Sequence, residues 1–150
     1  GAYMESERRN ARKFQIEDPI WSSINETHIC YEVVSDLLLD DISKGSKTEV
    51  MFATHNKISI EHVIEKMEEG NISRDSKNVS FAQLLGMGDH LSFALGKGGY
   101  RAYKYLPFGG VEQVVPYLLR RVQENGSMLN GAESERKLVG HELIRRMTLI

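Results

Sequence analysis

The segment EVMFATHNKISIEHVIEKMEEG, residues 49–70, carries the pattern that decides the fold. Val50–Ala53 is a short, continuous apolar run, and such a run is typical of a strand buried on both faces. The run stops abruptly at three polar residues, Thr54, His55 and Asn56. A strand that is apolar first and polar at its carboxyl end is typical of α/β proteins, whose sites lie at that edge of the sheet.

A helical pattern follows this strand directly. Apolar residues return at three- and four-residue intervals, which predicts a helix with one buried face. Ser59 is a plausible N-cap for it and Gly70 a plausible stop. The residues that set the spacing are Ile60, Val63, Ile64 and Met67.

The same order recurs along the rest of the chain. Residues 79–89 (VSFAQLLGMGD) and 100–110 (YRAYKYLPFGG) are further strand candidates that end in turn residues. Strands that alternate with helices predict a parallel sheet. No G-x-G-x-x-G follows a strand, so a barrel is favoured over a Rossmann fold. The predicted helices cover residues 25–39, 90–99 (a short helix or turn), 116–129 and 133–147.

The length limits how much of a barrel this chain can form. A complete (βα)8 barrel takes about 250 residues, and this chain has 150. We therefore expect an α/β fold that is the C-terminal half of a (βα)8 barrel. Residues 1–20 contain a charged run that we expect to be a solvated segment.

The composition is that of an ordinary globular domain and excludes several classes of protein. Hydrophobic residues make up 41% of the chain and charged residues 27%, with a net charge of −2. A nucleic-acid-binding domain would normally show a basic excess. No apolar run approaches the ~18 residues that a membrane span needs. The single cysteine, Cys30, cannot form an internal disulfide, and we expect a buried, inert thiol.

Two adjacent arginines, Arg120 and Arg121, stand on a helix that is otherwise rich in apolar residues. At ~100° per residue they share one face with Tyr117 and Glu124, opposite the apolar face of Val115, Leu118, Leu119 and Val122. One interpretation is a solvent-facing charged surface. The other is a clamp for a carboxylate, because guanidinium groups donate in a planar fork that matches two carboxylate oxygens.

The polar triplet Thr54–Asn56 is a second candidate site. Its hydroxyl, imidazole and amide groups suit the polar edge of a ring or a pyrophosphate, although a loop that only caps the next helix is an equal alternative. His55 has no Cys, Asp or Glu at metal-ligand spacing, so we predict no metal site. There is no G-x-S-x-G elbow and no defensible Ser/His/Asp order, so no catalytic nucleophile, acid or base is assigned.

Five motifs together resemble a known family. GAY, FATHN, QLLGMGD, YKYLPFG and YLLRRVQENGSML occur in the order and at the spacing found in the catalytic domain of proline dehydrogenases, and the likeness runs from Gly1 to about Arg145. The sequence of residues 81–109 resembles that of the eukaryotic mitochondrial enzymes more than that of the bacterial bifunctional ones.

The resemblance implies an FAD-dependent (βα)8 barrel that oxidises L-proline to 1-pyrroline-5-carboxylate by hydride transfer to the flavin. It implies that residues 1–145 belong to the C-terminal part of that barrel, from the end of its fifth strand, and that residues 146–150 are a tail. The earlier strands, which carry a lysine and an arginine of the family's site, would lie outside this chain. We therefore expect the chain alone to bind FAD weakly and to be inactive.

Matching the motifs residue by residue assigns roles to individual positions. Arg120 and Arg121 would clamp the proline carboxylate, and Tyr105 would pack against the proline ring. Further substrate contacts would come from Tyr117, Leu84 and Tyr3. The FAD contacts implied by the resemblance are Gly1, Ala2, Thr54, His55, Asn56, Gln83 and Glu124.

Tyr105 also bears on the choice of substrate. The related hydroxyproline dehydrogenases resemble this chain but have a small serine at this place, so a bulky tyrosine is expected to exclude 4-hydroxyproline. Hydroxyproline oxidation is one alternative, and a truncated, non-catalytic module is another. A third is a different flavin- or phosphate-binding barrel, with the arginines on a phosphate.

The resemblance also implies a place in the cell and an electron acceptor. It implies a mitochondrial location on the matrix side of the inner membrane, with ubiquinone as the acceptor. The terminal segment of residues 135–147 is expected either to touch that membrane or, as the simpler interpretation, to be a plain surface helix. No nucleic-acid partner is expected.

Overall fold

The computed structural model describes residues 2–124, 137, 140–141 and 143–148. The side chains of residues 2, 3 and 120–124 lie outside that description. The chain divides into two compact units, one formed by residues 19–106 and the other by residues 1–18 together with residues 107–150.

A parallel sheet of three strands organises the unit formed by residues 19–106. Its order is β1 (Val50–Ala53), β2 (Val79–Leu84), β3 (Ala102–Tyr105), so neighbours in sequence are neighbours in space. Phe52 pairs with Phe81, which in turn pairs with Ala102. All three predicted strands are confirmed, and so is their parallel arrangement, which requires a crossover helix between consecutive strands.

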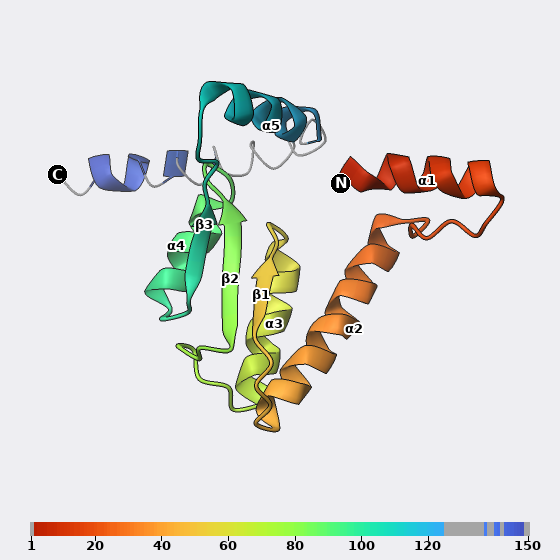
Figure 1. The fold of residues 1–150 in the computed structure, drawn as a ribbon. Helices are drawn as coiled ribbons and strands as arrows, with labels where there is room; N and C mark the ends of the chain where they lie inside the picture. The colour runs from red at the N-terminus through yellow and green to blue at the C-terminus, as the bar shows by residue number, and fades with distance from the viewer. Residues whose placement is uncertain (1, 125–136, 138–139, 142, 149–150) are drawn as a thin grey trace. The chain divides into compact units, whose positions relative to one another are not determined.

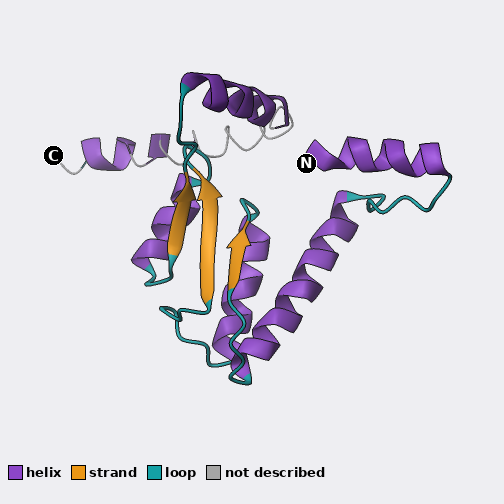
Figure 2. Ribbon diagram, in the orientation of Figure 1, coloured by secondary structure: helices purple, strands orange, loops and turns teal. Residues whose placement is uncertain are grey.

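Three helices accompany this sheet: α2 (Ile24–Ser43), α3 (Lys57–Glu69) and α4 (Asp89–Lys97). The helices α3 and α4 are the two crossovers, and both lie on one face of the sheet (Figure 1). The opposite face carries no helix of this unit (Figure 2). The sheet thus has a covered face, against which α3 and α4 pack, and a bare face, which no helix of this unit covers.

The core lies between the covered face and the helices. A row of aromatic rings runs across it: Phe52 stands 5.9 Å from Phe81, and Phe81 stands 5.8 Å from Tyr100, edge to face. Tyr31 of α2 extends the row with an edge contact to Phe52 at 6.4 Å. Apolar residues from the helices close over these rings, namely Leu39, Ile42, Ile60, Val63, Met67, Leu91 and Leu95.

Burial of β1 differs from the prediction. Phe52 is 3% exposed, but Met51 beside it is 54% exposed. Successive side chains of a strand point to opposite faces, and only the face that carries Phe52 is packed against helices. The expectation that Val50–Ala53 is buried on both faces is therefore wrong for the residues described.

The start of α3 also differs from the prediction. Asn56, not Ser59, is its N-cap, because the Asn56 side chain accepts a hydrogen bond from the Ile58 backbone N–H at 3.1 Å. Ser59 lies inside the helix and is buried. The predicted stop at Gly70 is confirmed as the C-cap.

The other unit contains α1 (Ala2–Phe14) and α5 (Val111–Glu124). The charged N-terminal run forms α1, and its described side chains other than that of Ala11 are exposed or half-buried, as expected of a solvated segment, while Ala11 is buried. The run contains neither Gly nor Pro between Ala2 and Phe14, and Ala, Arg, Glu, Met and Lys all favour a helix.

The apolar face of α5 is exposed in this structure, and the prediction for Cys30 of α2 is wrong. The apolar residues Val115, Leu118 and Leu119 are exposed, whereas Tyr117 is half-buried. Cys30 of α2 is half-buried, whereas a buried thiol was expected. Among the described residues, no helix combines the length and the apolar character needed to cross a membrane.

Candidate active site at the carboxyl edge of the sheet

The polar residues that follow β1 lie against the end of β2. Ala53 pairs with Ala82, so the chain that continues from Ala53 runs beside Gln83 and Leu84. The family resemblance implies that Thr54, His55, Asn56 and Gln83 contact FAD. Hydrogen bonds join these two segments at this edge, and their contact with a cofactor stays a prediction.

His55 continues the sheet ladder after β1 has ended. Its Nε2 accepts a hydrogen bond from the Leu84 backbone N–H at 3.0 Å. A ring nitrogen that accepts a proton donor has no proton of its own, so His55 is neutral with its proton on Nδ1. The imidazole thereby accepts the hydrogen bond of the Leu84 N–H, which lies beyond the last residue of β1.

Gln83 is buried and held at both ends of its amide. Its Nε2 donates to the Thr54 carbonyl oxygen at 3.3 Å, and its Oε1 accepts from the Ser92 hydroxyl at 2.8 Å. The side chain therefore joins the ends of β1 and β2 to the first turns of α4. In this structure Gln83 supports the edge of the sheet, and its contact with a cofactor stays a prediction.

Thr54 and Asn56 shape the start of α3. The Thr54 hydroxyl accepts from the Asn56 backbone N–H at 3.1 Å, and the Asn56 amide nitrogen lies 3.3 Å from Nδ1 of His28 in α2. The first turn of α3 contains no acidic residue and opens with Lys57. A helix amino terminus carries a partial positive charge and points its N–H groups outward, so it favours an anion.

The turn between β2 and α4 packs closely against His55. Gly88, in this turn, is buried with φ +60, and a Cβ atom built there would lie 3.3 Å from Cδ2 of His55. Gly86 also has a positive φ of 77, but nothing lies within 4 Å of its added Cβ. Glycine is therefore needed at both positions for the backbone, and at Gly88 also for the space beside the imidazole.

Lys104 holds this turn from β3, and no sequence pattern pointed to it. Its Nζ donates to the carbonyl oxygens of Met87 at 2.8 Å and Leu84 at 3.3 Å, and it forms an ion pair with Asp89 at 2.6 Å. The only available signal was a lysine placed between two tyrosines in a strand, YKY, which by alternation faces the opposite side from both.

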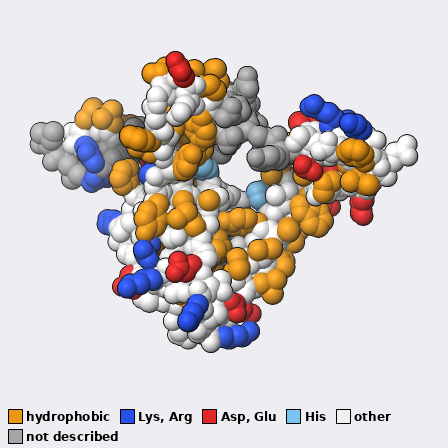
Figure 3. All heavy atoms as spheres, in the orientation of Figure 1, with side chains coloured by type: hydrophobic (Ala, Val, Ile, Leu, Met, Phe, Trp, Pro, Cys, Tyr) orange, Lys and Arg blue, Asp and Glu red, His pale blue; other side chains and the backbone are white. Residues whose placement is uncertain are grey.

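Two predicted substrate residues are neighbours on the bare face. Leu84 pairs with Tyr105 at the carboxyl ends of β2 and β3, and both alternate away from the covered face. Tyr105 is 53% exposed and Leu84 is half-buried. Hydrophobic side chains gather over this face of the sheet in the space-filling view (Figure 3). Other residues of the same face are Met51, Ala53, Ser80, Ala82 and Tyr103.

The remaining predicted site residues lie in the other unit. Arg120, Arg121 and Glu124 are on α5, and Ala2 and Tyr3 are on α1, but their side chains lie outside the description. Gly1 lies outside the described residues altogether.

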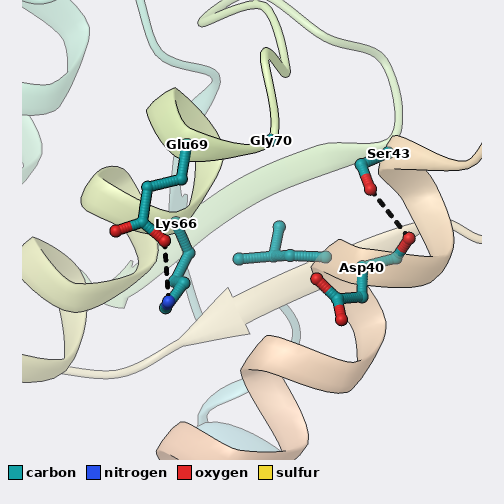
Figure 4. A pocket seen from close by; sticks show the side chains of 6 residues that line it. Asp40, Ser43, Lys66, Glu69 and Gly70 are labelled. Atoms are coloured by element: carbon teal, nitrogen blue, oxygen red, sulfur yellow. Dashed lines mark hydrogen bonds and ion pairs between the residues drawn. The ribbon is translucent and has the colours of Figure 1, made fainter.

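A pocket of about 280 Å³ lies elsewhere, between the carboxyl-terminal turns of α2 and α3 (Figure 4). Several of its polar groups contact one another: Lys66 forms an ion pair with Glu69 at 2.7 Å, and the Ser43 hydroxyl donates to the Asp40 backbone carbonyl at 2.8 Å. Since helices run back along the sheet, this pocket is at the end away from Thr54–Asn56. Among the described residues, no group of His, Cys, Asp and Glu is placed to hold a metal ion.

Comparison with known proteins gives one consistent match. The model of the proline dehydrogenase family matches residues 1–134. Hydroxyproline dehydrogenase of Xenopus laevis is 44% identical over 98% of this chain and 32% of its own length, and mitochondrial proline dehydrogenase 1 of Homo sapiens is 41% identical over 98% of this chain and 24% of its own length. The chain thus spans a third or less of these curated relatives.

Solved structures give the same result. Proline utilization A of Bdellovibrio bacteriovorus, inactivated by N-propargylglycine, matches with a TM-score of 0.72 and 28% identity, over 83% of this chain and 12% of that protein. A mutant of proline utilization A from Bradyrhizobium japonicum matches with a TM-score of 0.69 and 29% identity, over 84% and 12%.

Proposed function

Because the chain belongs to the proline dehydrogenase family, we propose that it forms the C-terminal part of a (βα)8 barrel that oxidises L-proline to 1-pyrroline-5-carboxylate. Residues 1–145 would belong to the barrel and residues 146–150 to a tail. The parallel sheet with its crossover helices supports the barrel. In such a barrel the helices lie outside and the inner face of the sheet is filled by side chains, which suits the bare face.

The pairing of Leu84 with Tyr105 is the observation that carries this proposal. In barrels of this kind the active site is built at the carboxyl ends of the strands. Leu84 and Tyr105 lie at that end and on the face that would line the interior. An aliphatic and an aromatic side chain, side by side, form an apolar wall of the kind that a saturated five-membered ring needs.

The residues present fit FAD. Its pyrophosphate is an anion, and the start of α3 offers helix N–H groups, the neighbouring Thr54–Asn56 segment and no acidic residue in the first turn. Thr54, His55, Asn56 and Gln83, together with Gly1, Ala2 and Glu124, would hold the cofactor. When bound, FAD supplies the acceptor for the hydride that leaves proline.

Arg120 and Arg121 would hold the substrate carboxylate. Guanidinium groups bind carboxylates through paired hydrogen bonds, worth about 1.5–3 kcal/mol each when charged. Such a clamp fixes the ring so that the carbon beside the nitrogen is presented for oxidation. Tyr117 and Tyr3 would complete the pocket.

Hydroxyproline oxidation is the second candidate, because relatives named hydroxyproline dehydrogenase are 42–44% identical to this chain. Relatives named proline dehydrogenase are 39–43% identical to it, and the two ranges overlap, so identity does not separate the two substrates. The bulk of Tyr105 favours proline over its 4-hydroxylated form.

The cellular setting follows from the relatives. Several are named mitochondrial, from Homo sapiens to Arabidopsis thaliana, which supports a mitochondrial location for this chain. We extend this to the matrix side of the inner membrane, with ubiquinone as electron acceptor. Peripheral contact with that membrane belongs to the same proposal.

A hybrid enzyme tests the proposed function. In it, the matching stretch of human proline dehydrogenase 1 is replaced by this chain. The hybrid should contain flavin by its absorbance and reduce a dye when proline is added, whereas Arg120→Met should retain the flavin and raise KM for proline by about tenfold or more. A hybrid that folds and binds flavin but does not oxidise proline contradicts the proposal. One that folds without flavin favours a non-catalytic module.

A further inference from the structure

The backbone of Leu84 is held on both sides by side chains. Its N–H donates to His55 Nε2 at 3.0 Å, and its carbonyl oxygen accepts from Lys104 Nζ at 3.3 Å. His55 comes from the end of β1 and Lys104 from β3, so the two strands that flank β2 each contribute one contact.

The turn that follows Leu84 has little stiffness of its own. Residues 85–88 read Leu-Gly-Met-Gly, and both glycines have positive φ values. Glycine is the residue with the most backbone freedom to lose on folding. Ordering this turn therefore depends on the contacts that it makes. One of them is local: the Met87 backbone N–H donates to the Leu84 carbonyl oxygen at 3.1 Å.

Two kinds of contact tie the turn to β3: the Leu85 backbone N–H donates to the Tyr105 carbonyl oxygen at 3.0 Å, and Lys104 adds contacts from its side chain. An ammonium group has three donors, and those of Lys104 match three acceptors, the carbonyls of Leu84 and Met87 and the Asp89 carboxylate. The acceptors lie at the start, within and just after the turn. Lys104 thereby ties both ends of the turn to β3, one residue before Tyr105.

We infer that Lys104 is a positioning residue for the substrate pocket. Together with the hydrogen bond from the Leu85 N–H to the Tyr105 carbonyl, it sets the separation between Leu84 and Tyr105 on the bare face, while its own side chain stays on the covered face. This inference rests on the proposed function, since it concerns the wall against which the proline ring would pack. Lys104 touches neither substrate nor cofactor in this role, and acts through the β2–α4 turn.

The test compares Lys104→Met with a matched control, Lys97→Met. Lys97 is an exposed lysine in the last turn of α4. Methionine keeps the length of the side chain and removes its donors. Asp89 is half-exposed, so water can solvate its carboxylate once the ion pair is lost, and the variant is expected to fold.

Hydrogen exchange of this chain is the readout that does not depend on activity. In Lys104→Met, amides of residues 85–88 should exchange about tenfold faster or more, with β1 unchanged. Lys97→Met should leave the turn as it was, and Lys104→Arg, which retains a cation and donors, should recover most of the protection. Equal exchange in the two methionine variants overturns the inference, whether or not the hybrid enzyme oxidises proline.

Kinetics of the hybrid enzyme give the second readout. Lys104→Met should raise KM for proline at least about fivefold at unchanged flavin content, because a displaced wall weakens binding of the ring. A purely structural role would lower the melting temperature and the active fraction with KM unchanged, and that pattern overturns the inference. Absence of proline oxidation in the unsubstituted hybrid would instead count against the proposed function.

Discussion

Leu84 and Tyr105 are paired residues of neighbouring parallel strands, and their side chains share the face of the sheet that no helix of the same unit covers. Gln83 and Lys104, which precede them, are also paired and point to the covered face. The same two strand ends therefore present an apolar pair on one side and a polar support on the other.

Substitution of Tyr105 tests its role in substrate choice. In the hybrid enzyme, Tyr105→Ser should raise kcat/KM for trans-4-hydroxy-L-proline relative to proline by about tenfold or more, because removal of the ring opens room for the hydroxyl. Tyr103→Ser is the control, since Tyr103 shares the bare face but lies two residues further from the carboxyl edge. If both substitutions leave the ratio of the two substrates unchanged, the steric argument fails.

The two glycines of the β2–α4 turn should respond differently to alanine. Gly86→Ala and Gly88→Ala both place a side chain at positive φ, which costs roughly 1 kcal/mol of unfolding free energy. Only Gly88→Ala also pushes on the His55 ring, 3.3 Å from the added Cβ. We expect the hybrid enzyme to lose flavin with Gly88→Ala and to retain it with Gly86→Ala. Equal flavin content in the two variants would show that His55 is not sensitive to this contact.

The aromatic row places Phe81 at the centre of the core, so stability should depend strongly on it. Phe81 is 1% exposed and contacts both Phe52 and Tyr100. Phe81→Ala should lower the free energy of unfolding by about 3–5 kcal/mol, as measured by denaturant titration of this chain. Phe93→Ala, at a 74% exposed position on α4, should cost less than about 0.5 kcal/mol. Similar losses at the two positions would contradict the core described here.

The burial of Tyr31 leads us to expect that the free energy of unfolding falls at alkaline pH. Burial raises the pKa of the Tyr31 hydroxyl above 10.0, so the folded state disfavours its ionised form. The stability linked to this group is therefore complete below pH 10 and is lost as the pH rises through the raised value.

Removal of the Tyr31 hydroxyl checks this assignment. Its oxygen is buried and has no hydrogen-bond partner among the described residues. Tyr31→Phe should therefore leave stability at pH 7 unchanged or raise it by about 1 kcal/mol, and should remove part of the loss of stability above pH 10 as measured by denaturant titration. A clear loss of stability at pH 7 would show that the hydroxyl makes a favourable contact.

Much of the sheet could be predicted from the sequence because its signals are local. The run Val50–Ala53 is bounded by polar residues on both sides, and β1 begins at Val50 and ends at Ala53. The helical spacing from Ile60 to Met67 and the stop at Gly70 are local in the same sense. Local alternatives are harder to separate: Asn56 and Ser59 are both good cap residues, and the hydrogen bond to Ile58 decides between them.

Features that depend on distant segments could not be predicted. The exposure of Met51 depends on which segments cover the bare face of the sheet, and no pattern within β1 predicts that cover. The contacts of Lys104 join residues 15 to 20 positions apart and exist only in the observed register of β2 and β3. The polar cluster at Thr54–Asn56 was predictable as a location, but the support role of Gln83 required its partners Thr54 and Ser92.

A crystal structure of the hybrid enzyme with tetrahydrofuroic acid, in which a ring oxygen replaces the nitrogen of proline, tests the central claim most directly. We expect the acid at the carboxyl edge of the sheet, with its carboxylate on the guanidinium groups of Arg120 and Arg121 and its ring against Leu84 and Tyr105. An acid bound elsewhere, or both arginines turned into solvent with the ligand in place, would contradict it.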